Sequence, residues 1–155
     1  MPANAVILDA NLFVLWVVGL ASPSYIARHK RLQAYSAKDF SLLTDMLSQA
    51  SRIVVTPNTV TETSNLAGQI AEPARRHIFT ILVTVLQKAE EIYVSSRRAS
   101  ENASFLRLGI TDAALLDIMT EDHILLTSDL DLYLQASRQG MKAVNFIHHI
   151  EANRP

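Results

Sequence analysis

The chain has 155 residues, of which 49% are hydrophobic and 19% are charged, and its formal net charge is -1. This length and composition predict a single domain over residues 1–155 and exclude a disordered or low-complexity chain. The near-neutral charge excludes a protein that holds nucleic acid by bulk positive charge alone. Because the chain contains no cysteine, disulfide scaffolds, thiolate zinc sites and cysteine nucleophiles are also excluded.

The beginning of the chain carries no pattern of export or membrane insertion. Its first residues, Met-Pro-Ala-Asn, lack the basic segment of a signal peptide. The apolar stretch from Leu12 to Ala21 is about half the length needed to span a bilayer. We therefore expect a soluble, cytoplasmic protein with no membrane association.

Short β-rich runs alternate with longer helical segments along the chain, which is typical of a parallel α/β sheet. The strand runs are continuously apolar, as expected where helices cover both faces of a sheet. We therefore expect an α/β fold of three layers, α/β/α, around a central and mostly parallel sheet of four to five strands. The predicted strands are Ala5–Leu8, Arg52–Thr56, Ile92–Ser95, His123–Thr127 and the shorter Ala143–Phe146.

The segments between these strands have helical spacing and recognisable start and stop residues. Ser36 and Pro73 are favourable helix-start residues, and Gly109 and Gly140 are favourable C-caps. The predicted helices are Asn11–Leu20, Ser36 to about Ala50, one beginning near Thr59, Pro73–Gln87, Arg98–Leu108, Asp112–Thr120 and Leu130–Gln139.

Two carboxylates follow the first two predicted strands. Asp9 ends the first strand, where an unpaired buried charge is costly, and it can also cap the helix that follows. Glu62 lies after the second strand and forms a capping-box pattern with Thr59. Taken alone, the capping interpretation is adequate for Glu62 and competes with a ligand role for Asp9.

Two further carboxylates lie at predicted helix starts in the second half of the chain. Asp112 directly follows Thr111, a good N-cap, and a first-turn Asp interacts favourably with the helix dipole. Asp129 follows the fourth strand, between Ser128 and Asp131, which have capping-box-like spacing. Each of these acids can therefore also be explained by helix capping alone.

The joint placement of the four acids predicts more than capping. In open α/β sheets, ligands bind in the crevice outside the carboxyl ends of the strands, and these acids fall at or near that edge. A pair of like charges at 4 Å costs about 4 kcal/mol at an effective dielectric constant of 20, so such a cluster takes up protons or binds a cation. Oxygen ligands without cysteine or a well-placed histidine favour Mg²⁺ or Mn²⁺.

At these residues the sequence resembles the PIN-domain family of metal-dependent ribonucleases. The resemblance covers about residues 5–147. The family includes a branch of bacterial toxin–antitoxin ribonucleases (VapC-like toxins). The matching segments, in the order and rough spacing of the family, are VILDANLF, VTPNTVTETSNL, RLGITDAALLDI and ILLTSDLDLYLQASRQGMKAVNF. The resemblance implies a PIN-like fold and an endoribonuclease of single-domain size.

The resemblance also implies which residues form the site. The family's four metal-holding acids correspond to Asp9, Glu62, Asp112 and Asp129, which are therefore both the candidate catalytic and metal-ligating residues. Asp131 is an alternative for the fourth acid. Asn11, Thr127 and Ser128 match polar positions around these acids, and Asn11 would hold Asp9 in position.

Two segments depart from the family pattern. Gly19–Tyr35 is long and carries the basic run Arg28-His29-Lys30-Arg31, and Pro73–Gln87 is unusually apolar, with ILVTVL at its centre. It is the small single-domain size of the chain, and not these two segments, that resembles the toxin branch of the family.

The resulting hypothesis is hydrolysis of RNA phosphodiester bonds by a Mg²⁺- or Mn²⁺-dependent hydrolase. Basic residues are the natural contacts for the phosphates of an RNA substrate, although each can equally be part of a solvated helix face. The candidate RNA contacts are Arg28, Lys30, Arg31, Arg75, Arg76, Arg97, Arg98 and Arg107.

Three other readings share parts of this pattern. A phosphoryl-transfer enzyme with a nucleophilic Asp needs a second Asp two residues later, where this chain has Asn11. A receiver-like domain needs adjacent acids after the first strand and a late strand-end lysine, which are absent. A degenerate PIN-like domain that acts as a binding or scaffold module is disfavoured because all four acids are present.

The net charge acquires a different meaning once the four acids are treated as a site. Setting them aside leaves eleven acidic residues against fourteen basic ones, so the rest of the molecule is weakly basic, which suits a metal nuclease. The low charged fraction predicts that a partner covers part of the apolar surface. A homodimer or an antitoxin protein would supply such an interface.

Overall fold

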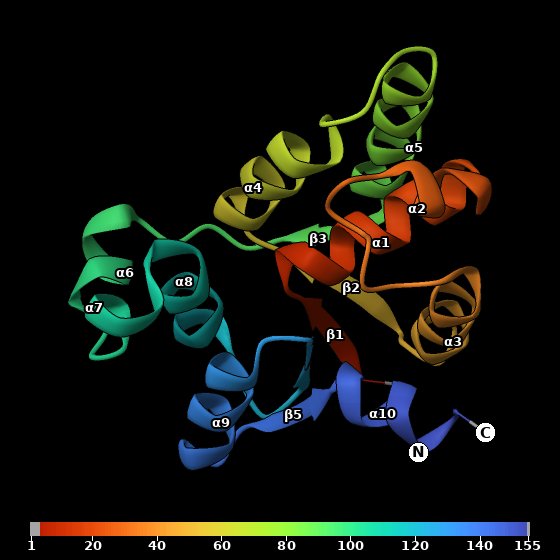
Figure 1. The fold of residues 1–155 in the computed structure, drawn as a ribbon. Coiled ribbons are helices and arrows are strands. Elements are labelled where there is room, and N and C mark those ends of the chain that lie inside the picture. The colour runs from red at the N-terminus through yellow and green to blue at the C-terminus, as the bar shows by residue number, and fades with distance from the viewer. Residues whose placement is uncertain (1–3, 155) are drawn as a thin grey trace.

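The computed structural model describes residues 4–154. Residues 1–3, on which the expectation of no signal peptide partly depends, lie outside the described residues. One five-stranded sheet runs through the molecule, with all strand pairs parallel and the order β3-β2-β1-β4-β5 (Figure 1). The strands are β1 (Ala5–Leu8), β2 (Arg52–Val55), β3 (Glu90–Glu91), β4 (His123–Thr127) and β5 (Lys142–Asn145).

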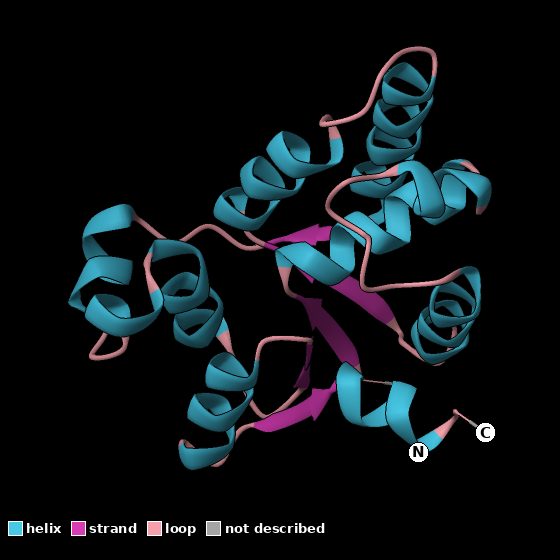
Figure 2. Ribbon diagram, viewed as in Figure 1, coloured by secondary structure: helices cyan, strands magenta, loops and turns pink. Residues whose placement is uncertain are grey.

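Helices cover both faces of this sheet (Figure 2), which confirms the expected α/β class and its three layers. None of the helices in residues 4–154 has the length and apolarity that a membrane crossing requires. The helices are α1 (Ala10–Ala21), α2 (Ser24–Arg28), α3 (Ala37–Leu47), α4 (Pro57–Ala67), α5 (Ala74–Lys88), α6 (Ser96–Glu101), α7 (Phe105–Leu108), α8 (Ile110–Ile118), α9 (Leu130–Arg138) and α10 (Phe146–Ala152).

Two hydrophobic cores form because successive residues of β1 point to opposite faces of the sheet. Val6 and Leu8 face the core that contains α1, α3, α5 and α10. Ala5 and Ile7 face a smaller core formed with α8 and α9. Nearly all of α1 is buried, as its apolar sequence predicts, and it contacts α3, α4 and α5. The side chains on both faces of β1 are thus packed into a core, which fixes the position of its carboxyl end.

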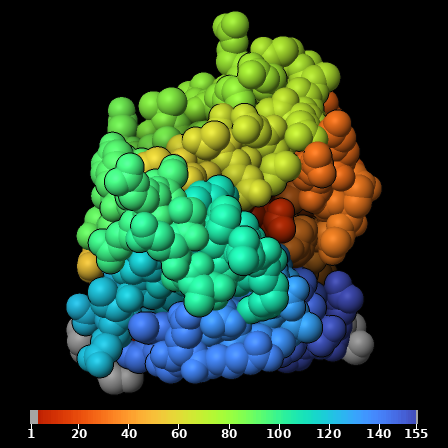
Figure 3. Space-filling view, turned by 90° about the vertical axis from the view of Figure 1, so that its left-hand side faces the viewer, coloured from red at the N-terminus to blue at the C-terminus, as the bar shows by residue number. Residues whose placement is uncertain are grey.

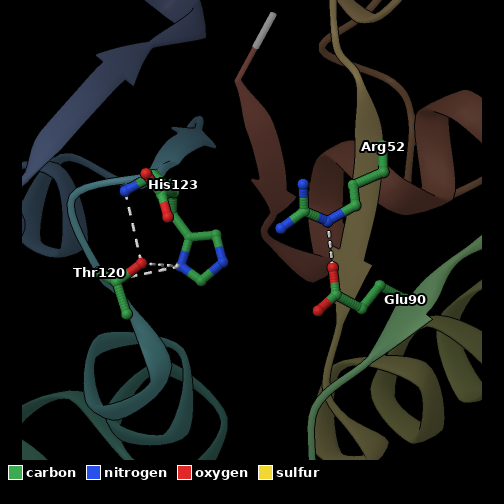
Figure 4. A network of polar contacts seen from close by, with 5 residues as sticks. Arg52, Glu90, Thr120 and His123 are labelled. Atoms are coloured by element: carbon green, nitrogen blue, oxygen red, sulfur yellow. Dashed lines mark hydrogen bonds and ion pairs between the residues drawn. The ribbon is translucent and has the colours of Figure 1, made fainter. Parts of the chain in front are cut away.

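The third strand differs from its prediction. Ile92–Ser95 is not a strand; the pairing lies earlier, where Glu90 and Glu91 pair with Val54 and Val55 of β2. Glu90 accepts a hydrogen bond from Arg52 Nε across this edge (Figure 4). Burial favours apolar residues in a strand, but at this sheet edge an ion pair accompanies the pairing and Tyr93 is exposed.

The amino ends of the strands lie at the opposite edge of the sheet from Asp9 and Asp129. Polar side chains form contacts at these amino ends. His123, at the start of β4, is buried, and its Nδ1 accepts a hydrogen bond from Thr120 N at 3.0 Å (Figure 4). Arg52 begins β2 at the same end, and both residues align with Ala5 of β1. These contacts are structural, since they lie at the far end of the strands from the acids.

The predicted helix Arg98–Leu108 is two helices. Ser95 caps α6, and a turn follows in which Ser104 N donates to Asn102 Oδ1 at 2.9 Å before α7 begins. Gly109 then separates α7 from α8 with φ of +86°, a conformation that favours glycine. The break sends α8 back along α6 and α7 and aims its first turn at the edge of the sheet.

Three N-cap predictions are wrong, by one to three residues. Thr56, not Thr59, caps α4, because Pro57 needs no hydrogen-bond acceptor for its nitrogen and can begin the helix. Gly109, not Thr111, precedes α8. Asp129, not Ser128, caps α9. Glu62 is consequently not a capping residue.

Candidate functional site

The sheet order reverses between β1 and β4, and two of the candidate acids flank this point. The chain passes from β1 to β2 on one side and returns to place β4 on the other side of β1. Asp9 follows β1 directly, and Asp129 lies two residues beyond the end of β4. Helices leave in opposite directions here, which opens a crevice at the carboxyl ends of the strands.

A small pocket of about 100 Å³ lies in this crevice. Glu62 reaches it from the second turn of α4 and Asp112 from the first turn of α8, and these two helices contact each other. Figure 3 shows the hollow: red atoms from the beginning of the chain lie between yellow α4 and teal α8. The pocket is lined by Asp9, Ala10, Asn11, Glu62, Asp112 and Asp129.

Asp9 is buried and rigidly held. Its Oδ1 accepts from Leu12 N at 3.0 Å, which caps α1, and its Oδ2 accepts from Ser128 N at 3.0 Å and from the Thr127 hydroxyl. Burial raises the pKa of Asp9 above its usual value; the three hydrogen bonds oppose this shift and the charge of Asp129 adds to it. Since a carboxylate has about four acceptor sites, about one remains free for a ligand.

Asp129 is tied to Asp9 through Thr127. The Thr127 hydroxyl donates to Asp9 and accepts from Asp129 N at 2.9 Å. Asp129 Oδ1 accepts from Leu132 N at 3.0 Å and so caps α9. One buried hydroxyl thus sets the relative position of the two acids that follow the adjacent strands.

The ionisation of Asp112 is also strongly perturbed. Its pKa rises to about 7, first because the side chain is buried and then because of the negative charges of Asp129, Asp9 and Glu62. All three of the other candidate acids therefore act on it. Strongly shifted carboxylates in a cleft are typical of functional sites, because a folded protein gains no stability from them.

The structure separates Asp129 from its alternative, Asp131. Asp129 lines the pocket, whereas Asp131 is exposed on α9 and lies 3.9 Å from Arg107 Nη1. Asn11 lines the pocket too, but within residues 4–154 its exposed side chain makes no hydrogen bond to Asp9. The expectation that Asn11 holds Asp9 is thus not met, because Leu12, Thr127 and Ser128 supply the donors.

Tyr35 also lies near this site, although it is not among the residues predicted from the sequence. Burial raises the pKa of its hydroxyl, a hydrogen bond to Ser128 acts in the opposite direction, and the charge of Asp9 raises it further. Its ring also lies 6.4 Å from that of Phe146. No local pattern marks Tyr35, because it lies in the connection between α2 and α3 and reaches Ser128 only through the fold.

The eight basic residues proposed to contact RNA do not line this pocket. They also do not line a larger groove that lies beside it, between α4 and the first turn of α8. Most have contacts within the chain: Arg98 Nε lies 2.7 Å from Asp117, Arg31 Nε donates to Gln69 at 2.8 Å, and Arg107 Nη2 donates to Gln135 at 2.8 Å. Arg28 and Arg75 lie over aromatic rings, and Arg76 lies 3.9 Å from Glu72. Among the described residues, Lys30 and Arg97 have no such side-chain partner.

The chemistry of the donor set fits a hard divalent cation. The pocket residues offer carboxylate and amide oxygens and include no Lys, Arg or His that would balance four acids. In residues 4–154 no three His, Asp or Glu side chains already stand at metal-ligating spacing, so the acids surround the pocket without closing on its centre. Repulsion among them favours that separation, and a cation would reverse it.

We expect the free energy of unfolding to fall as pH rises, and we expect Asp112→Asn to make this fall smaller. The pKa of Asp112 is about 7 in the fold against an ordinary value of 3.8, so the folded state is stabilised below pH 4 and loses this contribution as pH rises to 7. The shift corresponds to about 4 kcal/mol, and screening of the partly exposed carboxyl reduces it to about 2 kcal/mol.

Thermal or urea unfolding in EDTA at pH 5 and pH 8 measures this effect. The drop in the free energy of unfolding between the two pH values should be about 1 kcal/mol larger for the unsubstituted chain than for Asp112→Asn, because about two thirds of the pKa shift lies within this pH range. Adding Mn²⁺ at pH 8 should restore stability to the unsubstituted chain alone. Equal drops for both proteins would show that Asp112 has an ordinary pKa.

Comparison of the chain with models of known protein families and with curated proteins finds no match.

Proposed function

We propose that this chain is a Mg²⁺- or Mn²⁺-dependent endoribonuclease of the PIN-domain type. The observation that carries the proposal is one pocket, at the point where the sheet order reverses, lined by carboxylates from four separate segments. A structural cluster would pair these acids with basic side chains, but the pocket lining contains none. The three-layer parallel fold is consistent with the PIN-like architecture that the sequence resemblance implies.

The four acids would have different roles as metal ligands, because the fold holds some of them more firmly than others. Asp9, fixed by three hydrogen bonds, and Asp112 would be the principal ligands, with Asp129 and the more exposed Glu62 completing the set. A bound ion would polarise a phosphate oxygen and lower the pKa of a coordinated water. Since the pKa of Asp112 is about 7, cation binding at neutral pH displaces a proton, and apparent affinity should rise with pH.

The partners proposed for this function are an RNA substrate, a second copy of the chain and, if the chain is a toxin, an antitoxin protein in the cytoplasm. Large exposed apolar side chains on α7 and α9 support an interface of some kind: Leu106 is 94% exposed and Leu130 55% exposed. Size measurement of the purified chain, alone and with its genomic neighbour, tests this part separately.

Cleavage of a defined single-stranded RNA, with Mg²⁺, Mn²⁺ or EDTA, tests the proposed activity. Cleavage should require the ion and stop in EDTA. Calorimetric titration with Mn²⁺ should show binding that weakens in Asp9→Asn. Cleavage that survives both EDTA and Asp9→Asn would contradict the proposal, and a folded chain that binds no metal would favour the degenerate scaffold instead.

A further inference from the structure

A second, larger groove lies beside the acidic pocket, between α4 and the first turn of α8. Its volume is about 390 Å³, which falls within the roughly 300–1,000 Å³ typical of ligand sites. In Figure 3 it belongs to the region where yellow α4 faces teal α8. The groove is lined by Pro57, Asn58, Thr61, Glu62, Asn65, Leu66, Ile110 and Thr111.

The groove is continuous with the acidic pocket on both of its walls. On α4, Glu62 lines the groove and the pocket alike. On α8, Ile110 and Thr111 of the groove immediately precede Asp112 of the pocket. A ligand with one group at the acids would therefore have its neighbouring group within reach of this groove.

One wall of the groove is a polar face of α4. Asn58, Thr61 and Asn65 recur at the i, i+3 and i+7 spacing that places side chains on one side of a helix. Asn58 and Asn65 lie two turns apart, about 10 Å along the helix axis. Within residues 4–154, the side chains of these three residues form no hydrogen bond, so their donors and acceptors are free to meet a ligand.

The remaining lining residues define what kind of group fits. Leu66, Ile110 and Pro57 supply apolar contact surface, and the lining contains no Lys or Arg. Without a cation, and with Glu62 at its end, the groove disfavours a phosphate. A neutral, flat group with a polar edge fits this combination, because asparagine amides pair with the donor and acceptor atoms of a base edge.

We infer that this groove holds the nucleobase next to the cleaved phosphate and that Asn58 and Asn65 determine which base is preferred. This inference rests on the proposed ribonuclease function, because the phosphate of the same nucleotide would lie at the acids. Sequence-specific RNA recognition commonly uses unpaired bases read along their edges, so the substrate is single-stranded at this position.

The first test measures binding without metal or cleavage. Adenosine, cytidine, guanosine and uridine, which are uncharged and escape repulsion by the acids, are added at millimolar concentration to the full chain in EDTA. The side-chain NH₂ signals of Asn58 and Asn65 in nitrogen–proton NMR spectra should move with one nucleoside more than with the others. Ser64→Ala, on α4 but outside the groove lining, should leave these movements unchanged.

The second test measures the base preference of cleavage on a randomised single-stranded RNA in Mn²⁺. Asn58→Ala and Asn65→Ala should each reduce the preference at one position next to the cut by about tenfold, while Ser64→Ala keeps it. Unchanged preferences together with unmoved amide signals would overturn the groove assignment and leave the ribonuclease intact. Specific nucleoside binding without any cleavage would support the groove and overturn the hydrolytic function.

Discussion

Replacing Asp112 by asparagine should lower the rate of RNA cleavage by on the order of 10³-fold. Asp112 lies in the first turn of α8, and Asp9, Glu62 and Asp129 all act on its ionisation. Asparagine keeps the size of the side chain but removes one negative charge from the ligand set. The measurement is the single-turnover cleavage rate of a defined RNA in Mn²⁺, at a pH above 7 where Asp112 is ionised.

The control for this prediction comes from the pair of acids in the Asp129-Leu130-Asp131 run. Asp129 lines the pocket, whereas Asp131 is exposed and faces Arg107. Asp129→Asn should therefore impair cleavage strongly, and Asp131→Asn should leave the rate within about twofold, as for a surface ion pair. A large loss in Asp131→Asn with none in Asp112→Asn would show that the cation is held elsewhere.

The sheet was predictable because burial on both faces leaves a clear mark in sequence. β1 and β4 match their predictions residue for residue, since a strand covered on both sides is rich in apolar residues. β3 was misplaced, because it is an edge strand of two glutamates beside Arg52, and an ion pair leaves no apolar run. Helix starts were shifted where several residues in succession were able to cap, as at Thr56 and Thr59.

That Asp9 and Asp129 would lie close together was predictable because they follow β1 and β4, which are adjacent in the sheet. What supports them was less visible, because it depends on contacts between distant segments. Thr127 and Asp9 are separated by 118 residues, and nothing in the local sequence of either indicates their hydrogen bond. The same holds for Tyr35, which reaches Ser128 from a connecting segment.

The spacing of Thr59 and Glu62 fits a capping box, but it also fits two positions inside a helix that begins earlier. If Thr59 and Glu62 formed a capping box, Asn58 would precede the helix and would not share a face with Asn65. Because the helix begins at Pro57 instead, Glu62 lies in its second turn, on the face that also carries these two amides. The position of the helix start therefore decides whether Asn58 shares one face of α4 with Glu62 and Asn65.

Thr127→Val should reduce cleavage by about 10- to 100-fold and destabilise the fold by about 1–3 kcal/mol. Valine has nearly the shape of threonine but lacks the hydroxyl that donates to Asp9 and accepts from Asp129 N. Both buried partners would then lose a hydrogen bond, and the two acids would lose their common support. The cleavage rate and the urea midpoint of unfolding measure the two effects.

Thr127→Ser keeps the hydroxyl and should restore both quantities to near the values of the unsubstituted chain. The Mn²⁺ concentration needed for half-maximal cleavage separates positioning from a general loss of structure. If Thr127 positions the two acids, the valine variant should need more Mn²⁺ than the serine variant at a temperature where both are fully folded. Equal Mn²⁺ requirements would show that the hydroxyl supports the fold alone, because an unchanged ligand geometry predicts an unchanged metal affinity.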